Sequence, residues 1–169
     1  MKENIKRAVA DFITCDVDLL DLSAHEQAIS HRIAVYLESI YGPKELNVDC
    51  EYNKHLGESK RVDLQNINPE EFKTCNCDSC ETIVNGNIYE IPRKYFRPDI
   101  LVHSRGNDER NLIAIEVKKS KECPFDEAKL RALTKPRNAG GEYGYELGVF
   151  IWFIKNEPQY KWFVVGAQV

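Results

Sequence analysis

The sequence predicts an α/β domain in which helices cover a central mixed β-sheet. One stretch before position 42 repeats its apolar residues at helical spacing, and five later segments have the composition of strands. A second helical stretch separates the third of these strands from the fourth. The predicted order is therefore helix, three strands, helix, strand and strand. A chain of 169 residues can bury a real core, and we expect residues 1–169 to form one domain.

The first predicted helix covers residues 23–41. Its start has the pattern of a capping box, with Ser23 as the N-cap residue and Glu26 three residues later. Gly42 and Pro43 then end the helix. The apolar stripe between these two signals consists of Ala28, Ile29, Ile33, Ala34, Leu37 and Ile40.

The next segment, ELNVDCEYN at residues 45–53, alternates apolar and polar residues as a half-buried strand does. Residues 54–87 are mostly polar and include three cysteines. We interpret this stretch as an insertion with a short helix near Pro69 to Phe72. An insertion of this length is uncommon in a compact domain and is typically functional or internally cross-linked.

Two further strand segments follow, RPDILVHSRG at 97–106 and NLIAIEVKKS at 111–120, and a turn at Gly106 predicts that they form a β-hairpin. CPFDEAKLRALTK at 123–135 predicts a helix with Leu130 and Leu133 facing inward. YELGVFIWFI at 145–154 predicts a strand that is buried on both faces. YKWFVVG at 160–166 predicts a last strand, after a turn at 156–158.

The predicted hairpin carries charge inside apolar strands, with Asp99 in the first strand and Glu116 and Lys118 in the second. Strand side chains alternate between faces, so Glu116 and Lys118 share the face opposite Ile113 and Ile115, and strand pairing brings Asp99 near them. Two carboxylates and an amine suit a Mg²⁺ or Mn²⁺ site for phosphodiester hydrolysis. The alternative is a buried salt bridge from Lys118 to Glu116 or Asp99.

Pro98 and Asp99, sixteen intervening residues, and then Glu116, Val117 and Lys118 resemble the motif of the PD-(D/E)xK nuclease superfamily. The resemblance extends over about residues 23–154 outside the insertion, because the superfamily core has the order helix, three strands, helix, strand. It implies a restriction-endonuclease-like fold with αβββαβ order. It also implies a metal-dependent nuclease that hydrolyses phosphodiester bonds, with DNA as the expected substrate.

The resemblance further implies a role for each charged residue of the motif. Asp99, Glu116 and the backbone carbonyl of Val117 would hold Mg²⁺ or Mn²⁺, and Lys118 would serve the attacking water. The superfamily often has another acidic catalytic residue on its first helix, which here corresponds to Glu26. The capping box is an equal alternative for the side chain of Glu26.

Basic residues near the hairpin are the expected contacts to a polyanionic substrate. The net charge of the chain is −4, but residues 93–137 contain twelve Lys or Arg and seven Asp or Glu, which gives +5 there and −9 elsewhere. We expect Lys129, Arg131, Lys119 and Arg97 to contact the substrate. A solvated helix face is an equal alternative for Lys129 and Arg131.

Three of the six cysteines, Cys75, Cys77 and Cys80, lie in the segment CNCDSC. A structural Zn²⁺ site usually has four ligands, so Zn²⁺ binding here would need Cys50 or His55 as the fourth ligand. The alternative is three reduced surface thiols.

No segment has the apolar length of a signal peptide or a membrane span, so we expect a cytoplasmic protein without a membrane partner. Two other classes stay open beside the nuclease. One is a non-catalytic nucleic-acid-binding subunit that retains the fold, and the other is a protein whose zinc-held insertion binds a partner protein. A homodimer is a further expectation, because a nuclease that cuts both strands often needs two copies.

Overall fold

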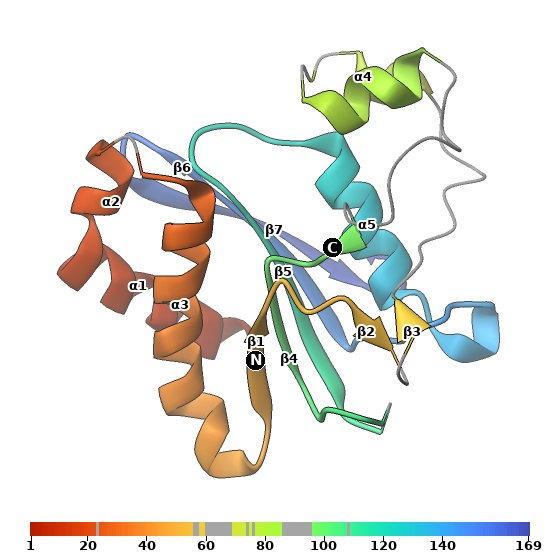
Figure 1. The fold of residues 1–169 in the computed structure, drawn as a ribbon, viewed down its shortest axis with the longest axis horizontal. Coiled ribbons are helices and arrows are strands. Elements are labelled where there is room, and N and C mark those ends of the chain that lie inside the picture. The colour runs from red at the N-terminus through yellow and green to blue at the C-terminus, as the bar shows by residue number, and fades with distance from the viewer. Residues whose placement is uncertain are drawn as a thin grey trace.

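A computed structural model describes residues 1–22, 24–55, 58–59, 69–73, 75, 77–85, 96–107 and 109–169, with the backbone alone for residues 55, 58, 59, 69 and 78. Its central feature is a six-stranded sheet that has helices on both faces (Figure 1). The elements in chain order are α1 (Lys2–Asp16), α2 (Asp18–Asp21), α3 (Glu26–Tyr41), η1 (Gly42–Lys44), β1 (Asn47–Cys50), β2 (Lys54–His55), β3 (Glu58–Ser59), η2 (Pro69–Phe72), α4 (Asp78–Val84), β4 (Ile100–His103), β5 (Asn111–Lys118), α5 (Pro124–Thr134), η5 (Arg137–Ala139), β6 (Leu147–Ile154), β7 (Glu157–Val164) and β8 (Ala167–Gln168).

The strands of the main sheet lie in the order β1-β4-β5-β6-β7-β8. β4 and β5 form the predicted antiparallel hairpin, in which Leu101 lies opposite Ala114. β5 and β6 are parallel, because α5 carries the chain over one face of the sheet between them. The other neighbouring strands of this sheet are antiparallel. The predicted α/β class with a mixed sheet is confirmed.

The two faces of β5 belong to two different apolar cores. Ile113 and Ile115 pack in a core with the buried residues of α1 and α3. Ala114 packs in a second core with Leu130 and Leu133 of α5. The alternation predicted for the hairpin is therefore correct, and the polar residues that follow Ala114 on its face are directed toward α5.

α3 begins later than predicted. Its first residue is Glu26, its N-cap residue is His25, and no side chain caps it with a hydrogen bond. The predicted capping box is therefore wrong, because Glu26 is the first helical residue and not the third; Ser23 lies outside the described residues. The stripe that includes Ile29 and Ile33 is buried as predicted.

Two helices precede the first predicted element. α1 buries residues at helical spacing, namely Ile5, Ala8, Val9 and Phe12, in the core that it shares with α3. This spacing is present in the sequence and could have predicted α1. In the described part of the chain, no helix is both long and apolar enough to cross a membrane.

Two strand boundaries differ from the prediction because of residues with positive φ. β1 ends at Cys50, since Glu51 has a φ of 50° and turns the chain out of the sheet. β7 starts already at Glu157, because Lys155 and Asn156 have φ values of 52° and 65° and form a two-residue hairpin turn.

Described residues of the insertion at 54–87 pack against α5. The described parts of the insertion are the β2–β3 pair, η2 and α4, and η2 is the short helix predicted near Pro69 to Phe72. Phe72, Cys80 and Ile83 are buried in the same core as Phe125 of α5. The insertion therefore makes apolar contacts with the core, although its composition is mostly polar.

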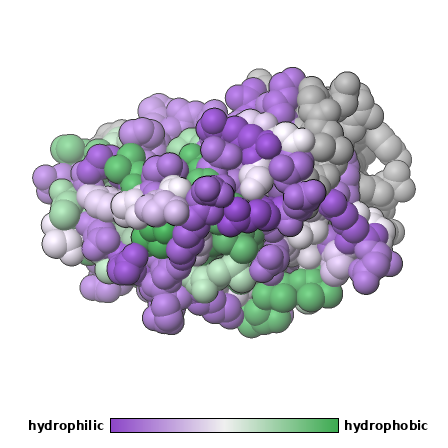
Figure 2. All heavy atoms as spheres, turned by 90° about the horizontal axis from the view of Figure 1, so that it is seen from below, coloured by the Kyte–Doolittle hydropathy of each residue, from purple (hydrophilic) through white to green (hydrophobic). Residues whose placement is uncertain are grey.

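Apolar side chains are mostly inside the molecule. On the face drawn in Figure 2, hydrophilic residues predominate and the apolar ones appear in separate groups. The large apolar residues that are exposed come from different elements, such as Leu22 after α2, Val35 in α3 and Val165 after β7. Single exposed apolar residues of this kind are normal for a folded domain.

We predict that Ile33→Ala lowers the free energy of unfolding by about 2–5 kcal/mol, because it leaves a cavity in a fully buried region. Val35 lies on the outer side of the same helix and is 42% exposed. Val35→Ala is therefore the matched control and should change stability by less than about 1 kcal/mol. Urea unfolding followed by circular dichroism measures both values. Equal losses would contradict the packing assigned to α3.

Candidate functional site

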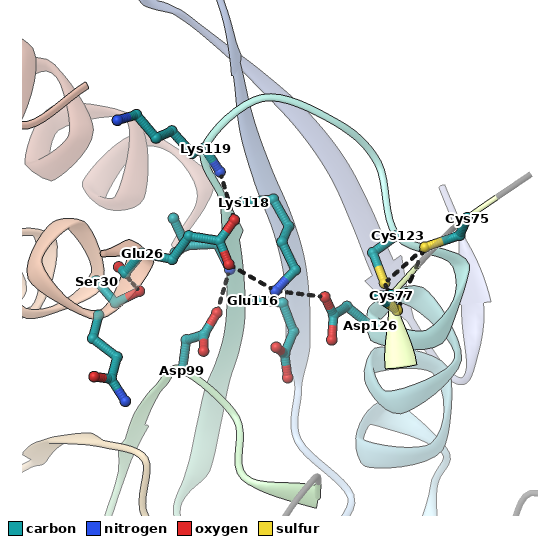
Figure 3. A network of polar contacts seen from close by, with 12 residues as sticks. Glu26, Ser30, Cys75, Cys77, Asp99, Glu116, Lys118, Lys119, Cys123 and Asp126 are labelled. Carbon is teal, nitrogen blue, oxygen red and sulfur yellow. Dashed lines mark hydrogen bonds and ion pairs between the residues drawn. The ribbon is translucent and has the colours of Figure 1, made fainter. Parts of the chain in front are cut away.

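The charged residues of the hairpin lie between the start of α3 and the first turns of α5 (Figure 3). Asp99 comes one residue before β4, and its Oδ2 accepts a hydrogen bond from the backbone N of Val117 at 2.7 Å. This bond joins the entry of β4 to the end of β5. It fixes the Asp99 carboxylate beside the two charged positions of β5.

Glu116 lies on the face of β5 that is directed toward α5 and is only 1% exposed. Its Oε2 accepts a hydrogen bond from Lys129 Nζ at 2.8 Å. Its Oε1 is buried and has no hydrogen-bond partner among the described residues. A buried carboxylate oxygen in this state is costly unless a cation or a donor satisfies it.

Asp126 completes the group on α5, and the sequence analysis did not predict its role. Its Oδ1 lies 2.8 Å from Lys129 Nζ, and its Oδ2 lies 3.3 Å from Lys118 Nζ. Asp126 therefore connects the lysine of α5 with the lysine of β5. The signal in the sequence is the spacing of Asp126 three positions before Lys129, which puts both side chains on one face of a helix.

Glu26 reaches the same place from α3. Its Oε2 accepts a hydrogen bond from Lys118 Nζ at 3.0 Å, and its Oε1 accepts one from the backbone N of Lys119 at 3.1 Å. Both carboxylate oxygens are thus used at the end of β5. Among the described ion pairs, Lys118 pairs with Glu26 and Asp126. The predicted salt-bridge alternative, with Glu116 or Asp99 as its partner, is not the arrangement found.

These six side chains form the charged cluster: Glu26, Asp99, Glu116, Lys118, Asp126 and Lys129. A pocket of about 470 Å³ opens beside it. The residues that line the pocket are Gln27, Glu51, Cys77, Ser79, Arg97, Asp99, Lys118, Cys123, Phe125, Asp126 and Lys129. The pocket is thus bounded by α3, the hairpin, α5 and the insertion.

Burial and charge act in opposite directions on the carboxyl groups of the cluster. Burial raises the pKa of Asp99 to about 6, against the attraction of Lys129. Burial also raises the pKa of Glu116 well above its usual value, and the charge of Asp99 adds to this effect. The pKa of Asp126 is lowered, because Lys129 and Lys118 together outweigh the effect of burial.

The two lysines stay charged. Burial alone would lower the pKa of Lys118, but the charges of Asp126, Asp99 and Glu26 outweigh it and raise that pKa. The pKa of Lys129 is raised in the same way, with Asp126 as the largest opposing charge. Both side chains are therefore ammonium groups that lie against carboxylates.

The net charge of the charged cluster matches that of one divalent cation, and the cluster has a carboxylate oxygen without a partner among the described residues that could bind it. Four carboxylates and two ammonium groups, all ionised, leave a net charge of −2. Asp99 and Glu116 provide two of the carboxylates, and Glu116 Oε1 lacks any partner among the described residues. Carboxylate oxygens are the ligands that Mg²⁺ and Mn²⁺ prefer. In the described part of the chain, no three carboxylates lie close enough together to hold one metal ion as they stand.

The four residues predicted to contact a substrate lie in different places. Arg97 and Lys129 line the pocket. Arg97 lies 3.6 Å from Glu51, and Lys129 is buried, so a solvated helix face is wrong for Lys129. Arg131 lies over the ring of Phe163, away from the pocket. The Nζ of Lys119 donates to the backbone oxygen of Leu22 at the end of α2.

A second group of side chains, the cysteine cluster, lies beside the same pocket. It consists of Cys75, Cys77, Cys80 and Cys123, whose sulfur atoms all lie within 4.8 Å of one another. The sulfur of Cys75 is 3.5 Å from that of Cys77 and 3.8 Å from that of Cys123. These distances exclude disulfide bonds, and all four cysteines are free. Four thiols in this arrangement could bind a metal ion.

The fourth cysteine is Cys123, not Cys50. Cys50 is exposed in β1 and outside the cluster, so that expectation is wrong; the side chain of His55 is outside the described residues. Cys123 is 43 residues beyond Cys80 and comes directly before α5. Its spacing from the CNCDSC segment carried no signal, because only the packing of the insertion on α5 brings them together.

Hydrogen bonds between the thiols shift their pKa values in opposite directions. The pKa of the Cys77 thiol lies well below its usual range, because Cys123 and Cys80 donate hydrogen bonds to it. The same contact with Cys77 raises the pKa of Cys123. Metal binding would deprotonate the other thiols, since thiolates are the ligating form.

Comparisons with models of protein families, with curated proteins and with solved structures found no match for this chain. Only the chemistry of its own side chains points to a function. That chemistry consists of a buried charged cluster at the end of β5 and a cysteine cluster on the same pocket.

We predict that Asp99→Asn stabilises the metal-free protein at neutral pH but not at pH 4. The carboxyl of Asp99 loses its proton near pH 4 when unfolded and near pH 6 when folded, so the wild type loses stability as the pH rises between these values. Asparagine does not titrate and can still accept the hydrogen bond from Val117. The advantage of the variant should therefore grow by up to about 3 kcal/mol between pH 4 and pH 7. Urea unfolding without added Mg²⁺ or Mn²⁺ measures it, and a pH-independent difference would contradict the raised pKa.

Proposed function

We propose that this protein is a metal-dependent nuclease that hydrolyses phosphodiester bonds, most directly in DNA. The observation that carries the proposal is the buried Glu116 Oε1, which lacks a partner within the described residues. Glu116 belongs to the same charged cluster as Asp99 and Lys118, which both line the pocket. A purely structural ion-pair network would be expected to satisfy that oxygen.

Asp99 and Glu116 would hold Mg²⁺ or Mn²⁺, together with the backbone carbonyl of Val117. Such a cation polarises a phosphoryl oxygen and lowers the pKa of a bound water. The hydrogen bond from Val117 N to Asp99 Oδ2 holds one carboxylate in place. The ion pair with Lys129 holds the other and leaves its Oε1 free.

Lys118 would act as a charged donor. Its Nζ lies 3.0 Å from Glu26 and 3.3 Å from Asp126, and two carboxylates at these distances favour the ammonium form. An ammonium group can orient the attacking water and offset the negative charge that develops on the phosphoryl group. Glu26 and Asp126 would thus be positioning residues for Lys118.

The order of elements supports the proposal. α3, β1, β4, β5, α5 and β6 follow one another as helix, three strands, helix and strand, apart from the small elements of the insertion. This is the order that the resemblance to the PD-(D/E)xK nucleases implies. The motif residues lie at the end of the hairpin within it, next to a pocket with Arg97 on its wall. Arg97 offers a guanidinium for a substrate phosphate, and its Nε has no hydrogen-bond partner in the described part of the chain.

One observation favours a second candidate, a non-catalytic nucleic-acid-binding subunit. Lys129 already pairs with Glu116 and with Asp126, so part of the carboxylate charge is neutralised without a cation. A subunit of this kind would bind nucleic acid without cleaving it. Its binding would not depend on the free oxygen of Glu116.

We predict that wild-type protein with Mn²⁺ or Mg²⁺ cleaves DNA and that Glu116→Gln and Lys118→Met each lower the rate by about 100-fold or more. Glutamine keeps the size of Glu116 but loses the charge that a cation needs. Glu109→Gln, in the exposed turn of the hairpin, is the control and should cleave normally. Gel assays on plasmid and linear DNA measure cleavage, and circular dichroism checks the fold.

The two candidates give different results in the same experiment. Binding of DNA without cleavage by the wild type, and equal binding by Glu116→Gln, would leave the non-catalytic subunit. Cleavage that persists in Glu116→Gln would contradict the assignment of the pocket as the active site.

We also propose that the metal ion of the cysteine cluster is Zn²⁺ in a structural role. A tetrahedral Zn²⁺ with Zn–S bonds of about 2.3 Å holds its sulfurs about 3.8 Å apart. The distances of 3.5 Å and 3.8 Å between the sulfurs of Cys75, Cys77 and Cys123 agree with that geometry. A [4Fe–4S] cluster would need larger separations, because each of its thiolates ligates a different iron.

We predict one Zn²⁺ per chain in protein purified without chelators. Removing it with a strong chelator should lower the melting temperature, because the thiols then lose the ion that joins two segments of the chain. Elemental analysis and thermal unfolding test both points, with Mg²⁺ present throughout so that the two kinds of site are told apart. Iron in place of zinc, or no bound transition metal, would contradict this assignment.

A further inference from the structure

The cysteine cluster and the charged cluster share one pocket. Cys77 and Cys123 line it together with Lys118, Asp126 and Lys129. Figure 3 shows Cys123 and Cys77 on the Asp126 side of the charged cluster, with Glu26 on its other side. The thiols are therefore part of the wall of the pocket and not a separate feature of the insertion.

α5 is the element that both clusters have in common. Its N-cap residue is Cys123, and the backbone N of Glu127 donates to the backbone O of Cys123 at 3.1 Å. Asp126 and Lys129 follow in the first two turns of the helix. A displacement of Cys123 would therefore displace both charged residues of α5, since a helix moves as a stiff rod over so short a length.

The sulfur of Cys123 lies at the N-cap position of α5. No side chain caps it with a hydrogen bond, and the sulfur of Cys123 is directed toward Cys75 and Cys77. The first turn of α5 also forms ion pairs, Asp126 with Lys118 and Glu127 with Lys161. The ring of Phe125 packs near Phe96 at 6.0 Å. The thiols thus take the position at which a capping side chain would otherwise hold the helix.

We propose that a metal ion in the cysteine cluster stabilises the position of α5 and thereby holds Asp126 and Lys129 against Lys118 and Glu116. The ion would join the 75–80 segment to the N-terminus of α5 and close one wall of the pocket. This inference rests on the proposed function, because that function identifies the pocket as an active site. The effect of the ion on the position of α5 can be measured without a cleavage assay.

Cys75→Ser is the informative variant, because Cys75 is a ligand that is not part of α5. It removes one thiolate from the metal site and leaves the sequence of α5 intact. Cys15→Ser is the matched control, since Cys15 is exposed on α1 and far from the pocket in the chain. Zn²⁺-stripped wild type, with and without re-added Zn²⁺, provides the same comparison without any substitution.

Two measurements test whether loss of the thiol-bound metal changes α5. Hydrogen exchange of the backbone amides at 124–134 should become at least about tenfold faster in Cys75→Ser and in the stripped wild type. The affinity of the charged cluster for Mn²⁺, followed by electron paramagnetic resonance, should fall by about tenfold, as is usual when a supporting contact of a metal ligand is lost. Cys15→Ser should behave as wild type in both measurements, and re-added Zn²⁺ should restore the stripped protein.

The results separate this inference from the proposed nuclease. Normal exchange in α5 and normal Mn²⁺ affinity after loss of the thiol-bound metal would overturn the inference, whatever the cleavage assay shows. If the wild type binds no Mn²⁺, the exchange measurement and the zinc reversal still decide whether the ion positions α5, while the proposed nuclease fails. If Cys75→Ser does not fold, the stripped wild type gives the answer.

Discussion

The contact between Lys129 Nζ and Glu116 Oε2 joins α5 to the middle of the sheet, and the charged cluster depends on it. Both groups are almost completely buried, at 5% and 1% exposure. Removing either partner would leave an unpaired charge in the interior, which is strongly destabilising. Because the pair is not exposed, salt should screen it only weakly. The position of α5 over the parallel pair β5 and β6 is therefore set by charge as well as by apolar packing.

The remaining charged groups are arranged around this pair at a cost in stability. Asp99 and Glu116 are held where burial raises their pKa values, although apolar residues of similar size could fill the same space. A fold under selection for stability alone would have little reason to retain them. A cation that offsets the net charge of the cluster would remove much of this cost.

The sequence was a good guide where local pattern and packing agree. The alternation in β5, with Ile113 and Ile115 opposite Ala114 and Glu116, was readable because strand side chains alternate faces in any context. The helix at 124–134 was readable from its inward leucines, Leu130 and Leu133. Predictions failed where a single φ value or a contact between distant residues determined the end of an element or the partner of a side chain. Positive φ at Glu51 and Asn156 moved two strand ends, and α3 began at Glu26 although Ser23 has the better capping chemistry.

By itself the sequence determined the α/β class, the hairpin, the face on which Glu116 and Lys118 lie, and three of the four clustered thiols. These features follow from periodicity and from short-range spacing, which tertiary contacts do not change. Only the tertiary structure decided that Asp126 pairs with Lys118, that Glu26 reaches Lys118 and the backbone of Lys119, and that Cys123 completes the cysteine cluster. Each of these contacts joins residues that are far apart in the chain or on different elements. Their meeting depends on how α3, α5 and the insertion pack against the sheet, and no local pattern encodes that packing.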